Sequence, residues 1–99
     1  MRLTNKQKQL ITDIASQLVS DQCRVYLFGS RLDDNALGGD IDLLLEFVNP
    51  VDNPALLAAR FSARVSRAMS GRKVDVLISA PNLLRLPIHE IAFSEGQLL

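Results

Sequence analysis

The stretch LFGSRLDDNALGGDIDLLLE, residues 27–46, places two apolar runs on either side of a loop rich in glycine and aspartate. The second run opens with two acids, Asp40 and Asp42, separated by one isoleucine. Side chains at i and i+2 of a strand share a face, so both carboxylates point the same way while Ile41 points into the core. Two anions held this close repel each other unless a cation lies between them. The plainer alternative is an exposed strand rim that carries two solvated acids.

A third acid, Asp75, lies in the alternating run KVDVLIS at residues 73–79. The run predicts a strand in which Asp75 lies on the face opposite to its two valine neighbours. We expect an acid in so apolar a run to have a function, because burying an unpaired charge is costly. If this strand lies beside the one that carries the first two acids, the three carboxylates form a cluster of the oxygen ligands that magnesium prefers. An ion pair of Asp75 with Arg72 or Lys73 is the alternative.

Gly29 and Ser30 directly follow the first predicted strand. Glycine lets the backbone approach a bulky anion, and the N–H groups and serine hydroxyl of the turn can point at phosphate oxygens. A simple turn at a strand end also explains a Gly-Ser pair.

Helices and strands alternate along the chain, and Thr4 and Gln7 resemble a capping box at the first helix. The elements that spacing and turn residues predict are a helix over about residues 5–20, strands over 24–28 and 41–48, a helix that begins at Pro54 and ends near Gly71, a strand over 73–79, and a weaker helical segment over 83–95. This order predicts an α/β fold in which helices cover a sheet.

Composition limits the classes of function. The chain has 99 residues, of which 47% are hydrophobic, so we expect a single domain over residues 1–99 with a real core. Eleven basic and eleven acidic side chains cancel, which argues against nucleic acid or an anionic membrane as a partner. A single cysteine, no signal-peptide pattern and no long apolar run lead us to expect a soluble cytoplasmic domain.

The combined pattern GSR…GGDIDLLLE…VDVLI resembles the nucleotidyltransferase domain of the DNA polymerase β-like superfamily. In that family Gly-Ser is followed about ten residues later by Asp-x-Asp, with a third acid on a later strand. The chain is most similar to the minimal nucleotidyltransferases (MNT), stand-alone domains that act as antitoxins to HEPN toxins. The resemblance covers nearly the whole chain and implies a small mixed β-sheet covered by helices.

The resemblance also implies a role for each residue that matches the family pattern. Gly29, Ser30 and Arg31 would bind the phosphates of the nucleotide. The ligands of two magnesium ions would be Asp40, Asp42 and Asp75, and Asp75 would also help to deprotonate the acceptor. The implied reaction moves AMP from ATP to a hydroxyl, in this case a tyrosine of a HEPN toxin. The acidic loop from Leu32 to Ala36 departs from the family, where basic residues are common.

Two other functions stay open. The chain could neutralise a partner by contact alone, or it could transfer a nucleotide to a small molecule or a nucleic acid.

Several further residues have plainer interpretations. We expect Glu46 to end a strand or to support the acids on whose face it lies, Cys23 to be a small buried residue, and Tyr26 to pack in the core or at an edge. We expect His89 to be a surface or partly packed residue rather than a metal ligand. The residues Arg60, Arg64 and Arg67 share one helix face, which is either solvated or a docking surface for an acidic partner.

Overall fold

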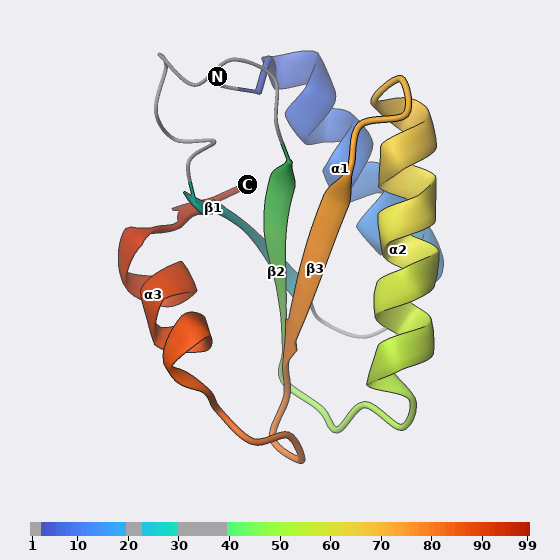
Figure 1. Cartoon of the computed structure of the whole chain (residues 1–99). Helices are drawn as coiled ribbons and strands as arrows, with labels where there is room; N and C mark the ends of the chain where they lie inside the picture. The colour runs from blue at the N-terminus through green and yellow to red at the C-terminus, as the bar shows by residue number, and fades with distance from the viewer. Residues whose placement is uncertain (1–2, 20–22, 30–39) are drawn as a thin grey trace.

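The computed structural model describes residues 3–19, 23–29 and 40–99 (Figure 1). The elements in this part of the chain are α1 (Asn5–Leu18), β1 (Cys23–Phe28), β2 (Ile41–Phe47), α2 (Pro54–Ala68), β3 (Val74–Ser79), α3 (Pro87–Glu95) and β4 (Gln97–Leu98). No helix within these residues has the length and apolar character that crossing a membrane requires.

The strands form one mixed sheet in the order β3-β2-β1-β4. β2 and β3 run parallel, while β1 is antiparallel to both β2 and β4. The mixed α/β fold expected from the resemblance is therefore confirmed. β4 was not predicted, because two residues are too few to show an alternating pattern. It forms because Leu98 and Gln97 pair with Tyr26 and Leu27 of β1.

Helices lie on both faces of the sheet but cover them unequally (Figure 1). α1 and α2 pack on one face, where the fully buried residues include Ile11, Leu43 and Phe61. α3 lies on the other face, where Ala92 packs against Phe28 and Leu44. The first face carries most of the core, and the second is only partly covered.

Local sequence explains where the helices begin and end. Thr4 and Gln7 form the predicted capping box, in which the Gln7 N–H donates to Thr4 Oγ1 at 3.1 Å and the Thr4 N–H donates to Gln7 Oε1 at 2.9 Å. α2 begins at Pro54 as expected, and it ends just before two residues with positive φ, Ser70 and Gly71. α3 begins at Pro87 rather than near residue 83, because the residue before a proline is held extended.

Candidate functional site

Two of the predicted site residues, Asp42 of β2 and Asp75 of β3, are direct partners in the parallel register. Their neighbours Ile41 and Val74 are buried on the opposite face, so the two acids share the face on which α3 lies. Adjacent strands lie about 4.8 Å apart, which brings the two carboxylates within reach of one cation. The structure thus joins two acids that are 33 positions apart in the chain.

The third predicted acid, Asp40, lies just before β2 and has a different partner. Lys73 Nζ lies 3.6 Å from Asp40 Oδ2, and the two side chains are 69% and 43% exposed respectively. The backbones of the two segments are also joined, since the Ile41 N–H donates to the Lys73 carbonyl at 2.9 Å. Lys73, one of the two residues considered as an ion-pair partner of Asp75, therefore pairs with Asp40 instead.

The acids do not form a finished metal site in this structure. Within residues 3–19, 23–29 and 40–99, no three His, Cys, Asp or Glu side chains are grouped so that they could hold a metal ion. Asp75 is exposed, so the expectation of a costly buried charge at this position was wrong; β3 is an edge strand, and this face of it is open. Two carboxylates on neighbouring strands still fit magnesium, which commonly takes one or two carboxylates and completes its shell with phosphate oxygens and water.

Gly29 lies directly against Asp42. Its φ is +79°, a conformation that favours glycine, and a Cβ placed on it would lie 2.5 Å from Asp42 Oδ2. A side chain at this position would displace the Asp42 carboxylate, because the atom that its Cβ would meet is the end of that side chain. Ser30 and Arg31, like the acidic loop from Leu32 to Ala36, lie outside the described residues, so their predicted contacts with phosphate stay predictions.

Glu46 lies on the same face as Asp42 but at the other end of β2. Four residues of strand separate the two acids by roughly 13 Å. Glu46 instead accepts a hydrogen bond from the Tyr26 hydroxyl at 3.3 Å. The Tyr26 ring in turn meets Phe93 of α3 edge to face, with the ring centroids 5.3 Å apart. Glu46 therefore helps to hold α3 against the sheet through Tyr26, and it does not support the pair of Asp42 and Asp75.

His89 is buried, with only 6% of its surface exposed, and so lies deeper than the surface or partly packed position expected from the sequence. Its Nδ1 accepts a hydrogen bond from the Leu86 N–H at 3.0 Å, and its Nε2 lies 3.0 Å from the Ile78 carbonyl oxygen. Because the carbonyl can only accept, Nε2 carries the proton. The ring joins the end of β3 to the start of α3 and is structural.

The arginines on α2 do not form one solvated face. Arg60 and Arg67 are exposed, whereas Arg64 is half-buried and donates from Nη2 to Gln17 Oε1 of α1. This contact ties the two helices together on the side of the sheet that faces away from the acids.

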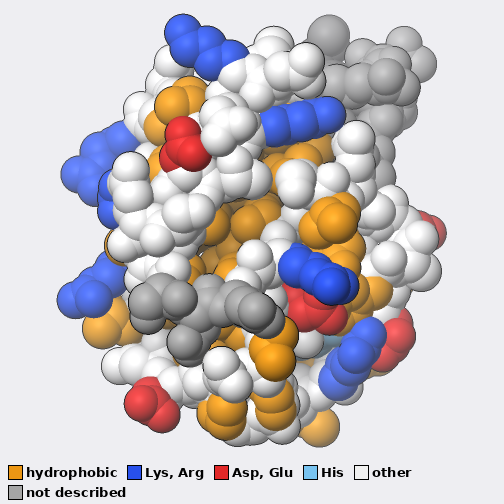
Figure 2. Space-filling view, turned by 180° about the vertical axis from the view of Figure 1, so that it is seen from behind, with side chains coloured by type: hydrophobic (Ala, Val, Ile, Leu, Met, Phe, Trp, Pro, Cys, Tyr) orange, Lys and Arg blue, Asp and Glu red, His pale blue; other side chains and the backbone are white. Residues whose placement is uncertain are grey.

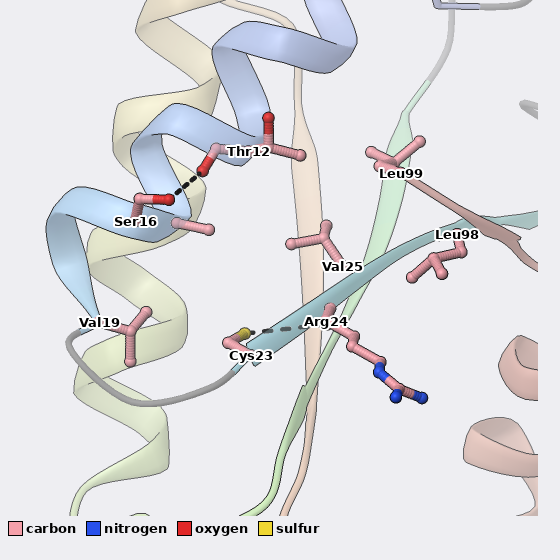
Figure 3. Close-up of a pocket in the computed structure, with 9 residues that line it drawn as sticks. Thr12, Ser16, Val19, Cys23, Arg24, Val25, Leu98 and Leu99 are labelled. Atoms are coloured by element: carbon pink, nitrogen blue, oxygen red, sulfur yellow. Dashed lines mark hydrogen bonds between the residues drawn. The ribbon is translucent and has the colours of Figure 1, made fainter.

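A groove of about 500 Å³ lies at the other end of β1 from Gly29, between α1, β1 and the end of the chain (Figure 3). Thr12 and Ser16 line it from α1, and Cys23, Val25 and Leu99 line it from the opposite side. Cys23 is half-buried, and its pKa is raised to about 11, chiefly by burial and then by the negative charge of Glu46. Arg24 also lines the groove and is the one charged side chain among the described residues there. None of these lining residues has a carboxylate or imidazole side chain, and the Cys23 thiol is protonated, so they offer no side-chain ligand suited to a metal ion.

Comparison with known proteins relates the chain to a protein family. Residues 8–99 match the family model of the nucleotidyltransferase domain. No curated protein sequence matched the chain. The site residues themselves are not tested by these comparisons, so their roles stay predictions.

Three solved structures have a similar fold. A structure from Shewanella oneidensis is 15% identical, with a TM-score of 0.73, over 98% of this chain and 71% of the other. A toxin–antitoxin with AMP-PNP is 16% identical, with a TM-score of 0.74, over 92% and 70%. A tri-AMPylated Shewanella oneidensis HEPN toxin in complex with MNT antitoxin is 17% identical, with a TM-score of 0.63, over 93% and 70%. At these identities the likeness establishes a shared fold.

Proposed function

Since the chain belongs to the nucleotidyltransferase domain family, we propose that it transfers AMP from ATP to a tyrosine hydroxyl of a HEPN-type toxin and thereby acts as an antitoxin. The observation that carries the proposal is the pairing of Asp42 with Asp75 across β2 and β3, with Gly29 packed against Asp42. Such a pair suits a metal–nucleotide complex better than it suits a structural role, because like charges directly opposite each other destabilise a sheet.

In this proposal Asp42 and Asp75 would hold magnesium, and Asp40 would be the third carboxylate ligand. Bound magnesium supplies positive charge that offsets the charge of the triphosphate, with two ions expected from the family resemblance. Asp75 lies on the exposed edge strand, where it can accept the proton of the incoming hydroxyl. The hydroxyl oxygen forms a bond to the α-phosphorus, the bond from that phosphorus to the bridging oxygen breaks, and pyrophosphate leaves. The glycine turn at residue 29 lets the backbone approach the phosphates.

A protein acceptor fits the surface beside α3. Four large apolar side chains are exposed on α3 and the segment before it, namely Leu84, Leu86, Ile88 and Ile91. Exposed apolar groups of this kind mark protein-binding surfaces. Because Ala92 of α3 packs against Phe28, the register partner of Asp42, a protein docked on α3 would bring its hydroxyl to the face that carries the acids.

The solved complexes support the same kind of partner. In one of the similar structures a HEPN toxin carries AMP in complex with an MNT antitoxin, and another holds AMP-PNP. Nucleic acid is a poorer acceptor for this chain. On the face that Figure 2 shows, Lys and Arg side chains are spread among hydrophobic and acidic ones rather than gathered in one patch.

A second candidate function is neutralisation of the toxin by contact alone. The observation that favours it is the absence, within the described residues, of three grouped ligands for a metal. A protein of this kind would need the apolar surface beside α3 but would not need the acids.

One experiment separates the two functions. The chain is incubated with Mg²⁺, ATP labelled in its α-phosphate, and the HEPN-type protein encoded by the adjacent gene. We expect label on that protein with the native chain and none with Asp42→Asn, together with loss of protection from the toxin. Protection by Asp42→Asn that equals protection by the native chain, with label transferred by neither, would establish neutralisation by contact.

A further inference from the structure

We propose that Lys73 is a positioning residue that changes partner during the reaction, from Asp40 before the nucleotide binds to the nucleotide's phosphates afterwards. This inference rests on the proposed function and adds a residue to it. Lys73 and Asp40 each lie one position before a partner pair of β2 and β3, so the parallel register sets them side by side. The lysine thus joins the acid cluster by the geometry of the sheet, and the 3.6 Å ion pair follows from it.

The ion pair between Lys73 and Asp40 can be replaced by other contacts at little cost. Both side chains are well exposed, and ion pairs in such positions are weak because water screens them. The backbone, by contrast, is fixed by the hydrogen bond from the Ile41 N–H to the Lys73 carbonyl. An ammonium group that leaves Asp40 therefore stays within the length of its own side chain from the acids.

The charges around Asp40 indicate what would displace the ammonium group of Lys73 from this carboxylate. Lys73 lies against Asp40, one of the carboxylates that the family resemblance assigns to the metal, so its ammonium group and a divalent cation compete for the same carboxylate. A cation that binds Asp40 has to displace the ammonium group, because like charges repel at this distance. The incoming triphosphate then offers the displaced group new acceptors, and a lysine on a flexible stem is a common ligand for phosphate.

If Lys73 exchanges partners in this way, removal of its ammonium group should change the affinities for two ligands in opposite directions. Mg²⁺ alone competes with Lys73 for Asp40, so removing the ammonium group should strengthen the binding of the metal. The metal–nucleotide complex gains a contact from Lys73, so the same change should weaken nucleotide binding. A lysine with a merely structural role would move both affinities in one direction or neither.

The test measures two affinities in the native chain and in Lys73→Met, which keeps the length of the side chain and loses its charge. Mg²⁺ is titrated alone by its effect on thermal unfolding, and AMP-PNP is titrated by calorimetry at saturating Mg²⁺. We expect Mg²⁺ to bind about three-fold more tightly and AMP-PNP about ten-fold more weakly to the variant, the latter being typical of one lost charge-assisted contact. Lys73→Arg should restore nucleotide binding, and Lys6→Met, at an exposed lysine of α1, should change neither affinity.

The outcomes distinguish this inference from the proposed function. If AMP-PNP binds to the native chain and equally well to Lys73→Met, the role of Lys73 is wrong while the nucleotide site stands. If AMP-PNP binds to neither, the proposed function fails and takes this inference with it. Weaker binding of both ligands to Lys73→Met would show that the lysine only holds the site in shape and would overturn the exchange.

Discussion

Asp42 and Asp75 face each other across the parallel pair of β2 and β3, so two like charges lie at directly opposed positions of a sheet. In most sheets such an arrangement is avoided because it is destabilising. Like charges at such positions repel each other, and a bound cation would offset that repulsion. Substitution of either acid should therefore have one effect on stability and another on nucleotide transfer.

The first prediction concerns Asp75→Asn. Transfer of AMP should fall by about 10³-fold or more, because the acid that accepts the proton and helps to bind the metal is lost. In the absence of Mg²⁺ the free energy of unfolding should rise by up to about 1 kcal/mol, because the repulsion from Asp42 is removed. Urea denaturation and the labelled-ATP assay measure the two effects. Asp52→Asn, at an exposed acid outside the sheet, should change neither.

The second prediction compares two glycines with nearly equal backbone angles. Gly29 has φ +79° and lies against Asp42, while Gly71 has φ +82° and a Cβ there would meet nothing within 4 Å. Gly29→Ala and Gly71→Ala should each cost about 1 kcal/mol of stability through the left-handed backbone. Only Gly29→Ala should also displace the Asp42 carboxylate and weaken AMP-PNP binding. Equal AMP-PNP affinities in the two variants would mean that Asp42 tolerates the displacement.

The third prediction concerns the buried His89. In His89→Ala the Leu86 N–H and the Ile78 carbonyl lose their partner, which should lower the free energy of unfolding by about 3 kcal/mol in a urea titration. Glu90→Gln on the same helix breaks only the exposed ion pair with Arg85 and should cost less than about 1 kcal/mol. Similar losses in the two variants would contradict the structural role of the histidine.

The fourth prediction follows from the raised pKa of Cys23, about 11 against a usual value of 9.0. The folded thiol should react slowly with iodoacetamide near pH 8 and faster as the pH approaches 11, because only the thiolate reacts. Glu46→Gln should lower this pKa and speed the reaction. Since the unfolded chain loses the proton first, stability should fall as the pH rises from 9 to 11, and Cys23→Ser should abolish that part of the fall.

The fifth prediction concerns the apolar surface beside α3. Ile91→Asp adds a charge at a side chain that is 46% exposed, so it should weaken binding of the HEPN-type partner by about ten-fold or more. AMP-PNP binding should be unchanged, because the acids are untouched. Ala63→Asp places the same charge on α2, across the sheet, and should leave both interactions intact. Unaltered partner binding by Ile91→Asp, measured by calorimetry, would place the interface elsewhere.

Much of the architecture could be predicted from short-range patterns. The capping box at Thr4 and the start of α2 at Pro54 depend on neighbouring residues and were confirmed. The sequence also shows directly that Asp42 and Asp75 lie on the face of the sheet opposite to their core-facing neighbours, because side chains alternate between faces along a strand. That the two strands are neighbours came from the family resemblance and not from the pattern.

The features that escaped prediction all depend on contacts between distant parts of the chain. From the sequence, Lys73 was only one of two alternative ion-pair partners for Asp75, because strand register cannot be read from one sequence. The register places Lys73 beside Asp40. His89 is buried because the end of β3 supplies a carbonyl eleven residues earlier, which local composition does not reveal. Asp75 is exposed because its strand lies at the edge of the sheet, a fact of topology rather than of hydrophobicity.

The unequal covering of the two faces bears on how such a protein changes through evolution. The face under α1 and α2 contains most of the core, whereas the acids lie on the partly open face near α3. Substitutions that remove the acids therefore leave the core intact and also remove the repulsion between like charges on β2 and β3. Descendants of such a chain can lose their chemistry in a single step and survive as folded binders, so loss of catalysis should be a frequent and easily tolerated event in its lineage.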